Sequence, residues 1–254
     1  MNILVINLKG GAAKTTNSSI IASYLPNATL VEIDKINKSD SKIISKDYKS
    51  LQVDFLNERD NQFLNFENLL LEDGVNIIDV GAVKLEAFHK AMSAANLYTT
   101  IDLLIIPAMD GADDFSVAMA YMNTIKNEIN SENILFSFNR FNEHEYTSPQ
   151  EQFSSFFDKK DEILKNFQID LIDESNYYIL KDSRAIKLAR SNKVTLKSLV
   201  DIDVDEITKK QRATKDKTER MELTKQRSLI LSAQNFYNEY VINMIQKITN
   251  KLES

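Results

Sequence analysis

A loop of small residues near the start of the chain joins an apolar segment to a lysine and two threonines. The apolar run is Ile3 to Ile6, and the sequence then reads Lys9-Gly10-Gly11-Ala12-Ala13-Lys14-Thr15-Thr16. Backbone N–H groups of such a loop, with the first turn of a following helix, form a nest of donors for phosphate oxygens. Lys14 supplies a point charge for the terminal phosphates of a nucleotide, and the Thr15 hydroxyl is a ligand for Mg²⁺. This order of strand, loop and helix predicts a phosphate-binding loop.

Lys9, at the front of this loop, is not required in a general phosphate-binding loop, so it points to a particular class of nucleotide-binding protein. The loop resembles the deviant Walker A motif, K-G-G-x-x-K-[ST], of the ParA and MinD family of ATPases, at Lys9, Gly10, Gly11, Lys14 and Thr15. The resemblance implies that two monomers sandwich two ATP molecules, with the front lysine reaching the phosphates bound to the partner subunit. It also implies that the loop from Gly10 to Thr16 holds ATP and Mg²⁺. The alternative is a turn between an unrelated strand and helix, because short motifs recur by chance.

One position departs from the family pattern. Alanine, Ala13, stands directly before the phosphate-binding lysine, where the family usually has glycine. If this position needs a positive φ, alanine costs roughly 1–2 kcal/mol, and if it tolerates the right-handed region the cost is close to zero. If the Ala13 amide is slightly misplaced, we expect ATP hydrolysis to slow more than ATP binding weakens.

Acidic residues end two further strand candidates. Asp79 lies in the run Val75 to Val80 with a glycine on either side, and it matches the Walker B aspartate that holds the Mg²⁺ shell through water. An aspartate at a strand end is also a common cap or turn former. Glu32 and Asp34 close the run from Thr29, on one face of a strand. The resemblance implies that Asp34 positions the attacking water, with Glu32 as a supporting candidate; the alternative is an exposed acidic edge.

A fourth strand candidate, residues 133–138, runs into Asn139 and Arg140. This pair is similar to the Asn-Arg pair after the family's adenine-side strand, which implies that the Asn139 side chain hydrogen-bonds the base. The run from Ile101 to Pro107 supplies another buried strand.

The whole chain fits one α/β domain over residues 1–254. Strand and helix patterns alternate up to about residue 190, which predicts a mainly parallel, twisted sheet flanked by helices, with a helical portion from about residue 200. The polar stretch 35–49 is expected to form a loop. The absence of cysteine excludes disulfides and iron–sulfur ligands. No long apolar run or signal-peptide pattern appears, which predicts a cytoplasmic protein.

Two basic stretches in the C-terminal third are candidates for DNA binding. The net charge is −6, so nucleic-acid binding needs a local basic patch. Residues 209–227 contain eight basic and three acidic residues, and Lys181, Arg184, Lys187 and Arg190 recur at every third position. The alternative is a solvated helix surface with i, i+4 pairs Glu206–Lys210 and Asp216–Arg220. In the ParA resemblance, basic residues of this half bind nonspecific DNA, so the candidates are Arg184, Lys187, Arg190, Lys210 and Arg212.

The last segment carries apolar residues at helical spacing from Tyr237 to Leu252 but few cations and no tryptophan. This pattern favours a helix docked on the body over one lying on a membrane. We therefore expect a Mg²⁺-dependent, dimerising ATPase of the ParA type. It partitions plasmid or chromosome DNA through ATP-switched, nonspecific DNA binding, associates with the nucleoid, and turns over slowly until a ParB-like or other partner activates it. Two alternatives stay open: a MinD-type positioning ATPase on a membrane, and a weakly hydrolysing nucleotide switch that serves as an adaptor in conjugative transfer.

Overall fold

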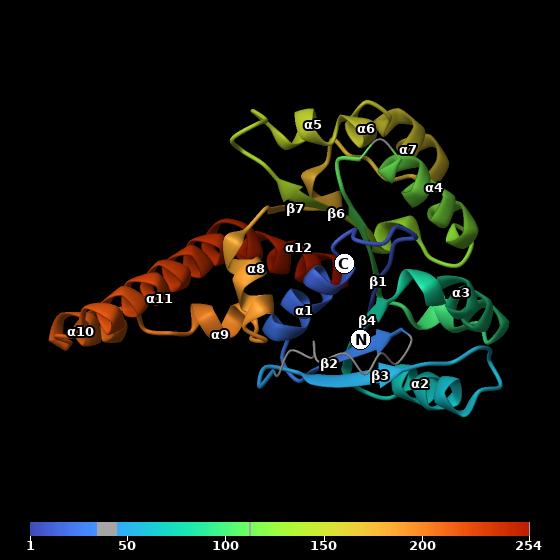
Figure 1. Ribbon diagram of the computed structural model, residues 1–254. Helices are drawn as coiled ribbons and strands as arrows, with labels where there is room; N and C mark the ends of the chain where they lie inside the picture. The colour runs from blue at the N-terminus through green and yellow to red at the C-terminus, as the bar shows by residue number, and fades with distance from the viewer. Residues whose placement is uncertain (35–44, 112, 254) are drawn as a thin grey trace.

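The computed structural model describes residues 1–34, 45–111 and 113–253 (Figure 1). Seven strands form one sheet in the order β3-β2-β4-β1-β5-β6-β7, and every neighbouring pair is parallel. The strands are β1 (Asn2–Val5), β2 (Ala28–Ile33), β3 (Lys49–Val53), β4 (Val75–Val80), β5 (Leu103–Ala108), β6 (Ile134–Phe141) and β7 (Tyr177–Lys181). The expected α/β fold with a mainly parallel sheet is confirmed.

Helices cover both faces of this sheet (Figure 1). They are α1 (Lys14–Tyr24), α2 (Asn61–Leu71), α3 (Leu85–Ala94), α4 (Asp114–Ile125), α5 (Pro149–Gln152), α6 (Ser154–Phe157), α7 (Lys160–Phe167), α8 (Arg184–Ser191), α9 (Leu196–Val200), α10 (Val204–Ala213), α11 (Lys217–Phe236) and α12 (Ile242–Glu253). A π-helical turn, Tyr237–Val241, joins the last two. In the part of the chain that the structure describes, no helix has the length and apolar character needed to cross a membrane.

The strand side chains divide between two apolar cores. In β1, Leu4 contributes to the core under α2 to α7, while Ile3 and Val5 contribute to the core under α1, α8, α11 and α12. Burial on both faces explains why these strands are continuous apolar runs without polar alternation. The second core also takes up Val241, Met244 and Ile248, so the C-terminal helix packs on the body.

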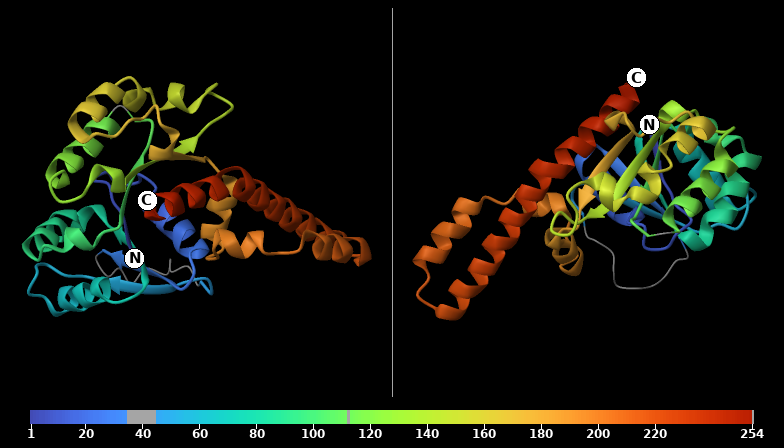
Figure 2. Two further views of the ribbon diagram at one scale, coloured as in Figure 1. Left: turned by 180° about the vertical axis from the view of Figure 1, so that it is seen from behind. Right: turned by 90° about the horizontal axis from the view of Figure 1, so that it is seen from above.

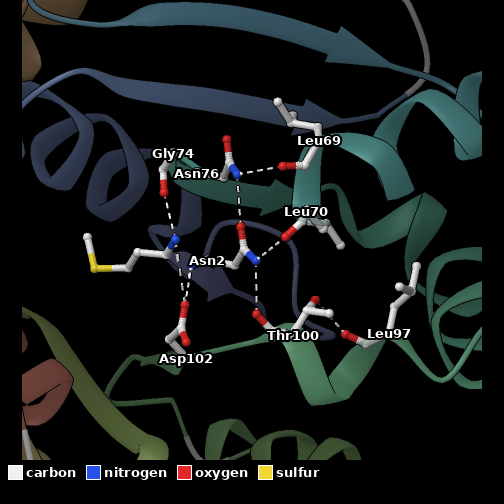
Figure 3. A network of polar contacts seen from close by, with 9 residues as sticks. Asn2, Leu69, Leu70, Gly74, Asn76, Leu97, Thr100 and Asp102 are labelled. Atoms are coloured by element: carbon white, nitrogen blue, oxygen red, sulfur yellow. Dashed lines mark hydrogen bonds and ion pairs between the residues drawn. The ribbon is translucent and has the colours of Figure 1, made fainter. Parts of the chain in front are cut away.

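A polar cluster fixes the edge where the central strands begin (Figure 3). The Asn2 amide donates to the carbonyls of Leu70 and Thr100, each at 2.9 Å, and accepts from the Asn76 amide at 2.8 Å. Because Asn2 and Asn76 are buried, these bonds satisfy polar groups that are costly to leave unpaired. The predicted site residues lie at the opposite edge, at the ends of the strands and in the loops that follow them.

Three details differ from the sequence-based expectations. Residue 49, expected in a loop, begins the edge strand β3, while residues 35–44 of the same stretch lie outside the described residues. Strand β6 continues beyond residue 138, with a register shift between Asn139 and Phe141. Lys181 is the last residue of β7, so the basic stripe expected on one helix is divided between a strand and α8.

Candidate functional site at the carboxyl edge of the sheet

The phosphate-binding loop lies between the central strand β1 and helix α1, which begins at Lys14. Gly11 and Ala13 adopt positive φ angles of 79° and 64°. The left-handed conformation turns the chain sharply into the helix, and glycine accepts it without the Cβ clash that alanine suffers. Ala13 is therefore at the position that needs a positive φ, and the departure from the family pattern has a conformational cost.

Lys14 is held inside this loop. Its ammonium group donates to the carbonyl oxygens of Asn7 at 2.8 Å and Lys9 at 2.9 Å, and the residue is only 8% exposed. Burial lowers the Lys14 pKa, and the charges of Asp79 and Asp34 oppose that effect. The lysine is thus a partly dehydrated cation at the centre of the loop, where it interacts strongly with an anion.

The predicted metal residues meet beside Lys14. Asp79, at the end of β4, is 7% exposed, and burial raises its pKa to about 6. The Thr15 hydroxyl hydrogen-bonds the Asp79 carboxylate and opposes that rise, whereas the nearby charges of Glu32 and Asp34 add to it. Glu32 of β2 is opposite Asp79 in the strand register. The structure thus brings Thr15, Asp79, Glu32 and Asp34 to one end of the sheet.

These donors suit one class of metal ion. No group of three or more His, Cys, Asp or Glu side chains able to hold a metal occurs among the described residues. One hydroxyl and one buried carboxylate fit Mg²⁺, which keeps several waters and takes its remaining ligands from phosphate oxygens. They do not fit an ion that requires an all-protein cage.

Asp34 sits directly over the glycine that follows β4. A Cβ built on Gly81 falls 2.6 Å from Asp34 Cγ and 2.7 Å from Oδ1, closer than non-bonded atoms approach. The Gly81 amide also donates to the Ile33 carbonyl at 2.8 Å, which ties this turn to the end of β2. Gly81 is therefore needed for space, since its own φ of −61° is open to any residue.

Lys9 makes a contact that sequence reasoning missed. Its ammonium group donates to Oδ2 of Asp114, the first residue of α4, at 2.6 Å. Asp114 is fully buried and its Oδ1 has no hydrogen-bond partner among the described residues, whereas the Lys9 side chain is 39% exposed. The hydrogen bond to Asp114 raises the Lys9 pKa. The only signal in the sequence is the acidic pair Asp113-Asp114 at a helix start, which is equally typical of a cap.

Asn139 belongs to β6 and is 2% exposed. Its side-chain oxygen accepts a hydrogen bond at 2.9 Å from Asn17 of α1, and its amide nitrogen donates to the Ser137 carbonyl at 2.7 Å. Asn17 also donates to the Ala13 carbonyl at 2.9 Å. In this arrangement the Asn139 amide connects β6 to the phosphate-binding loop through Asn17, a residue that sequence reasoning did not identify.

A cavity of about 350 Å³ extends from the loop to β7 and α8. Gly10 to Thr16 line it from the loop and the start of α1, and Leu180 and Ile186 contribute apolar surface. Its remaining lining residues are Gly81, Ala82, Asn139, Arg140, Lys181, Asp182, Ser183, Lys187 and Arg190. The size and the mixed polar and apolar lining suit a ligand that combines phosphate groups with a flat apolar group.

Two of the DNA-binding candidates, Lys187 and Arg190, belong to this cavity. Lys187 forms an ion pair with Asp182 at 2.6 Å, and Arg190 donates to the Thr16 hydroxyl at 3.4 Å. Arg184, one turn earlier on α8, is exposed and lines a separate groove against α11.

The other two candidates, Lys210 and Arg212, lie on an arm made of α10 and the first half of α11. The arm projects from the body (Figure 2), and α10 is held to α11 by a Gln211–Thr224 hydrogen bond of 2.7 Å. Both basic side chains are exposed, and neither forms an ion pair within the described residues. The alternative i, i+4 pairs are absent there too: Asp216 caps α11 and Arg220 donates to the Thr214 carbonyl.

Comparisons with known proteins address the fold. No protein-family model matches the sequence, and no curated protein matches it. Among solved structures, the chain is similar to a protein described as a plasmid partition protein of Borrelia burgdorferi B31, bound to AMPPNP. The TM-score is 0.50 at 14% identity, over 91% of this chain and 97% of that one. A chain of the MinC:MinD cell division protein complex of Aquifex aeolicus also gives a TM-score of 0.50 at 14% identity, over 94% and 96% of the two chains. The fold that the loop motif implied is therefore confirmed.

Proposed function

We propose that this protein is a Mg²⁺-dependent ATPase that binds ATP in the cavity beside Lys14. The observation that carries the proposal is that four side chains meet at the carboxyl ends of the neighbouring strands β2, β4 and β1. Asp34 follows β2, Asp79 is in β4, and Lys14 and Thr15 follow the loop after β1. A dehydrated lysine and a nest of amides bind phosphate, while a hydroxyl beside a buried carboxylate provides oxygens for Mg²⁺. The AMPPNP bound to the Borrelia protein of similar fold supports the choice of ATP.

The proposed chemistry is transfer of the terminal phosphoryl group to water. Bound Mg²⁺ neutralises charge on the phosphates. Lys14 stabilises the phosphate oxygens, and Asp34, held above Gly81, orients the attacking water with Glu32 in support. The strained Ala13 conformation supports slow turnover, which a ParB-like or other partner protein then accelerates.

Dimerisation in the ATP state follows if Lys9 acts on the phosphates of a partner subunit. In the single chain Lys9 is engaged by Asp114 at 2.6 Å, so dimerisation exchanges this ion pair for a phosphate contact. ATP hydrolysis then removes the phosphate that Lys9 contacts in the partner subunit, so Lys9 returns to Asp114 and the dimer separates.

The test of this step must separate the role of Lys9 from its effect on folding. Lys9→Ala leaves the buried Asp114 without its cation, which costs on the order of 3–5 kcal/mol. The double variant Lys9→Ala/Asp114→Asn removes both charges, and Asp114→Asn alone releases Lys9. With a nonhydrolysable ATP analogue, we expect light scattering to show a monomer for the double variant and a dimer at lower protein concentration for Asp114→Asn. Normal dimerisation of the double variant would show that Lys9 is only a loop residue.

We further propose that the dimer partitions DNA by nonspecific binding, in the cytoplasm and on the nucleoid. The exposed Lys210 and Arg212 on the arm, together with Arg184, support this reading. Phosphate contacts from such side chains are independent of sequence and sensitive to salt. A membrane-bound positioning role has less support, because the apolar side of α12 is packed in the core. ATP-driven dimerisation without phosphate release would instead support the adaptor function.

A further inference from the structure

Helix α8 packs its Arg190 side against the start of α1. Ala185 and Ala189 are buried and bring α8 close to the body, and Arg190 then reaches across to the Thr16 hydroxyl at 3.4 Å. Arg190 also lines a small cavity with Ser19 and Ile20 of α1. This side of α8 therefore faces the phosphate-binding helix, and Arg184 faces the groove on the other side.

The position of Thr16 indicates which part of a nucleotide Arg190 would meet. The terminal phosphates belong at Lys14 and Thr15, and Thr16 is the next residue along the wall of the same cavity. In ATP the group that adjoins the terminal phosphates is the α-phosphate with its attached ribose, so we place it next to them, at Thr16. Thr16 lies in the first turn of α1, whose free N–H groups favour an anion.

Arg190 has charge available for such an anion. The neighbouring cations of the cavity wall are paired, Lys187 with Asp182 and Lys181 with Glu143. Arg190 forms no ion pair among the residues that the structure describes, and its side chain donates to the neutral Thr16 hydroxyl. A planar guanidinium is also the group best suited to bind two phosphate oxygens at once.

We infer that Arg190 binds the α-phosphate of the nucleotide and is not part of a DNA-binding surface; the inference rests on the proposed ATP binding. A contact with the α-phosphate is present in ATP and in ADP alike. Arg190 therefore adds equally to the affinity for both, and it holds ADP after hydrolysis without distinguishing the two states.

Arg190→Gln and Arg184→Gln form a matched pair, because both positions are exposed arginines on α8. Titration calorimetry with Mg²⁺-ADP and with a Mg²⁺-bound nonhydrolysable ATP analogue measures the effect. We expect Arg190→Gln to weaken both nucleotides by the same factor, about tenfold or more, as for other hydrogen bonds to charged groups. Arg184→Gln should match wild type, and Arg190→Lys should recover part of the loss.

Three results would overturn the inference. The first is wild-type affinity for both nucleotides in Arg190→Gln. The second is a clearly larger loss of affinity for the ATP analogue than for ADP, which would place Arg190 on the terminal phosphates. The third is weaker binding of Arg190→Gln to duplex DNA with nucleotide affinity unchanged. Failure of the folded wild-type protein to bind either nucleotide would instead refute the proposed function.

Discussion

Ala13 shows how a single residue places conformational strain in the phosphate-binding loop. Its φ of 64° and ψ of 20° belong to the left-handed region, which costs an L-residue roughly 1–2 kcal/mol. The Ala13 carbonyl accepts a hydrogen bond from the Asn17 side chain at 2.9 Å, and Gly11, two residues earlier, also has a positive φ. The surrounding bonds thus keep the loop in its turn although alanine disfavours it.

We expect Ala13→Gly to increase the free energy of unfolding by about 0.5–1 kcal/mol, because relief of strain exceeds the added entropy of the unfolded chain. Chemical denaturation without nucleotide measures this. Ala12→Gly is the control: Ala12 is buried and its φ is not positive, so glycine there should destabilise the protein. An Ala13→Gly variant less stable than wild type would contradict the assigned strain.

Gly81 gives a second test at the scale of one residue. A methyl group here would overlap the Asp34 carboxylate, with Cβ 2.6 Å from Asp34 Cγ. We expect Gly81→Ala to displace Asp34 and to reduce steady-state phosphate release by tenfold or more, with ATP affinity little changed, since Lys14 and its loop remain in place.

The control for that variant is Gly74→Ala. Gly74 precedes the same strand, and a Cβ built there meets no atom of the described residues within 4 Å, so phosphate release should be normal. Normal phosphate release in Gly81→Ala would show that Asp34 does not act from its observed position.

At the scale of the elements, the arm of α10 and α11 is separate from the phosphate site. α10 buries only Ile207 among its described residues, and polar contacts such as Arg227 to Thr208 at 3.0 Å also hold it to α11. The arm is therefore a surface element whose exposed charges can be changed with little effect on the core.

We expect the double charge reversal Lys210→Glu/Arg212→Glu to weaken ATP-dependent binding to random duplex DNA and to leave ATP affinity unchanged. Each lost phosphate contact should also lower the slope of log K against log salt by about 0.9. Fluorescence anisotropy over a salt series measures both, and Lys90→Glu/Lys126→Glu, exposed lysines on α3 and beyond α4, is the control. An unchanged slope would remove the arm from the proposed DNA surface.

The elements also show what a sequence can predict. β4 was predicted at Val75–Val80 because an apolar run between two glycines has clear limits. β3 was missed because Lys49–Val53 is a largely exposed edge strand with little apolar pattern. The phosphate-binding loop is contiguous, so its residues were recognisable together. The Lys9–Asp114 pair joins residues 105 positions apart, and Asn17 and Tyr178 meet over 161 positions, so only the folded chain shows these contacts.

At the scale of the whole molecule, the parallel sheet explains why the site exists at all. The carboxyl ends of β1, β2 and β4 meet at one edge because these strands are parallel neighbours. Topology thus gathers a loop lysine, a hydroxyl and two strand-end carboxylates that are dispersed in the sequence. The same arrangement places ligands at the carboxyl edge of other open α/β sheets.

The central claim is that ATP binds at Lys14, and titration calorimetry with Mg²⁺ and a nonhydrolysable ATP analogue tests it most directly. We predict one nucleotide per chain for the wild-type protein and loss of most of that affinity in Lys14→Ala, checked for folding by circular dichroism. Lys90→Ala, at an exposed lysine far from the loop in sequence, should bind as wild type does. Absence of binding by the folded wild-type protein, or equal affinity in Lys14→Ala, would contradict the account.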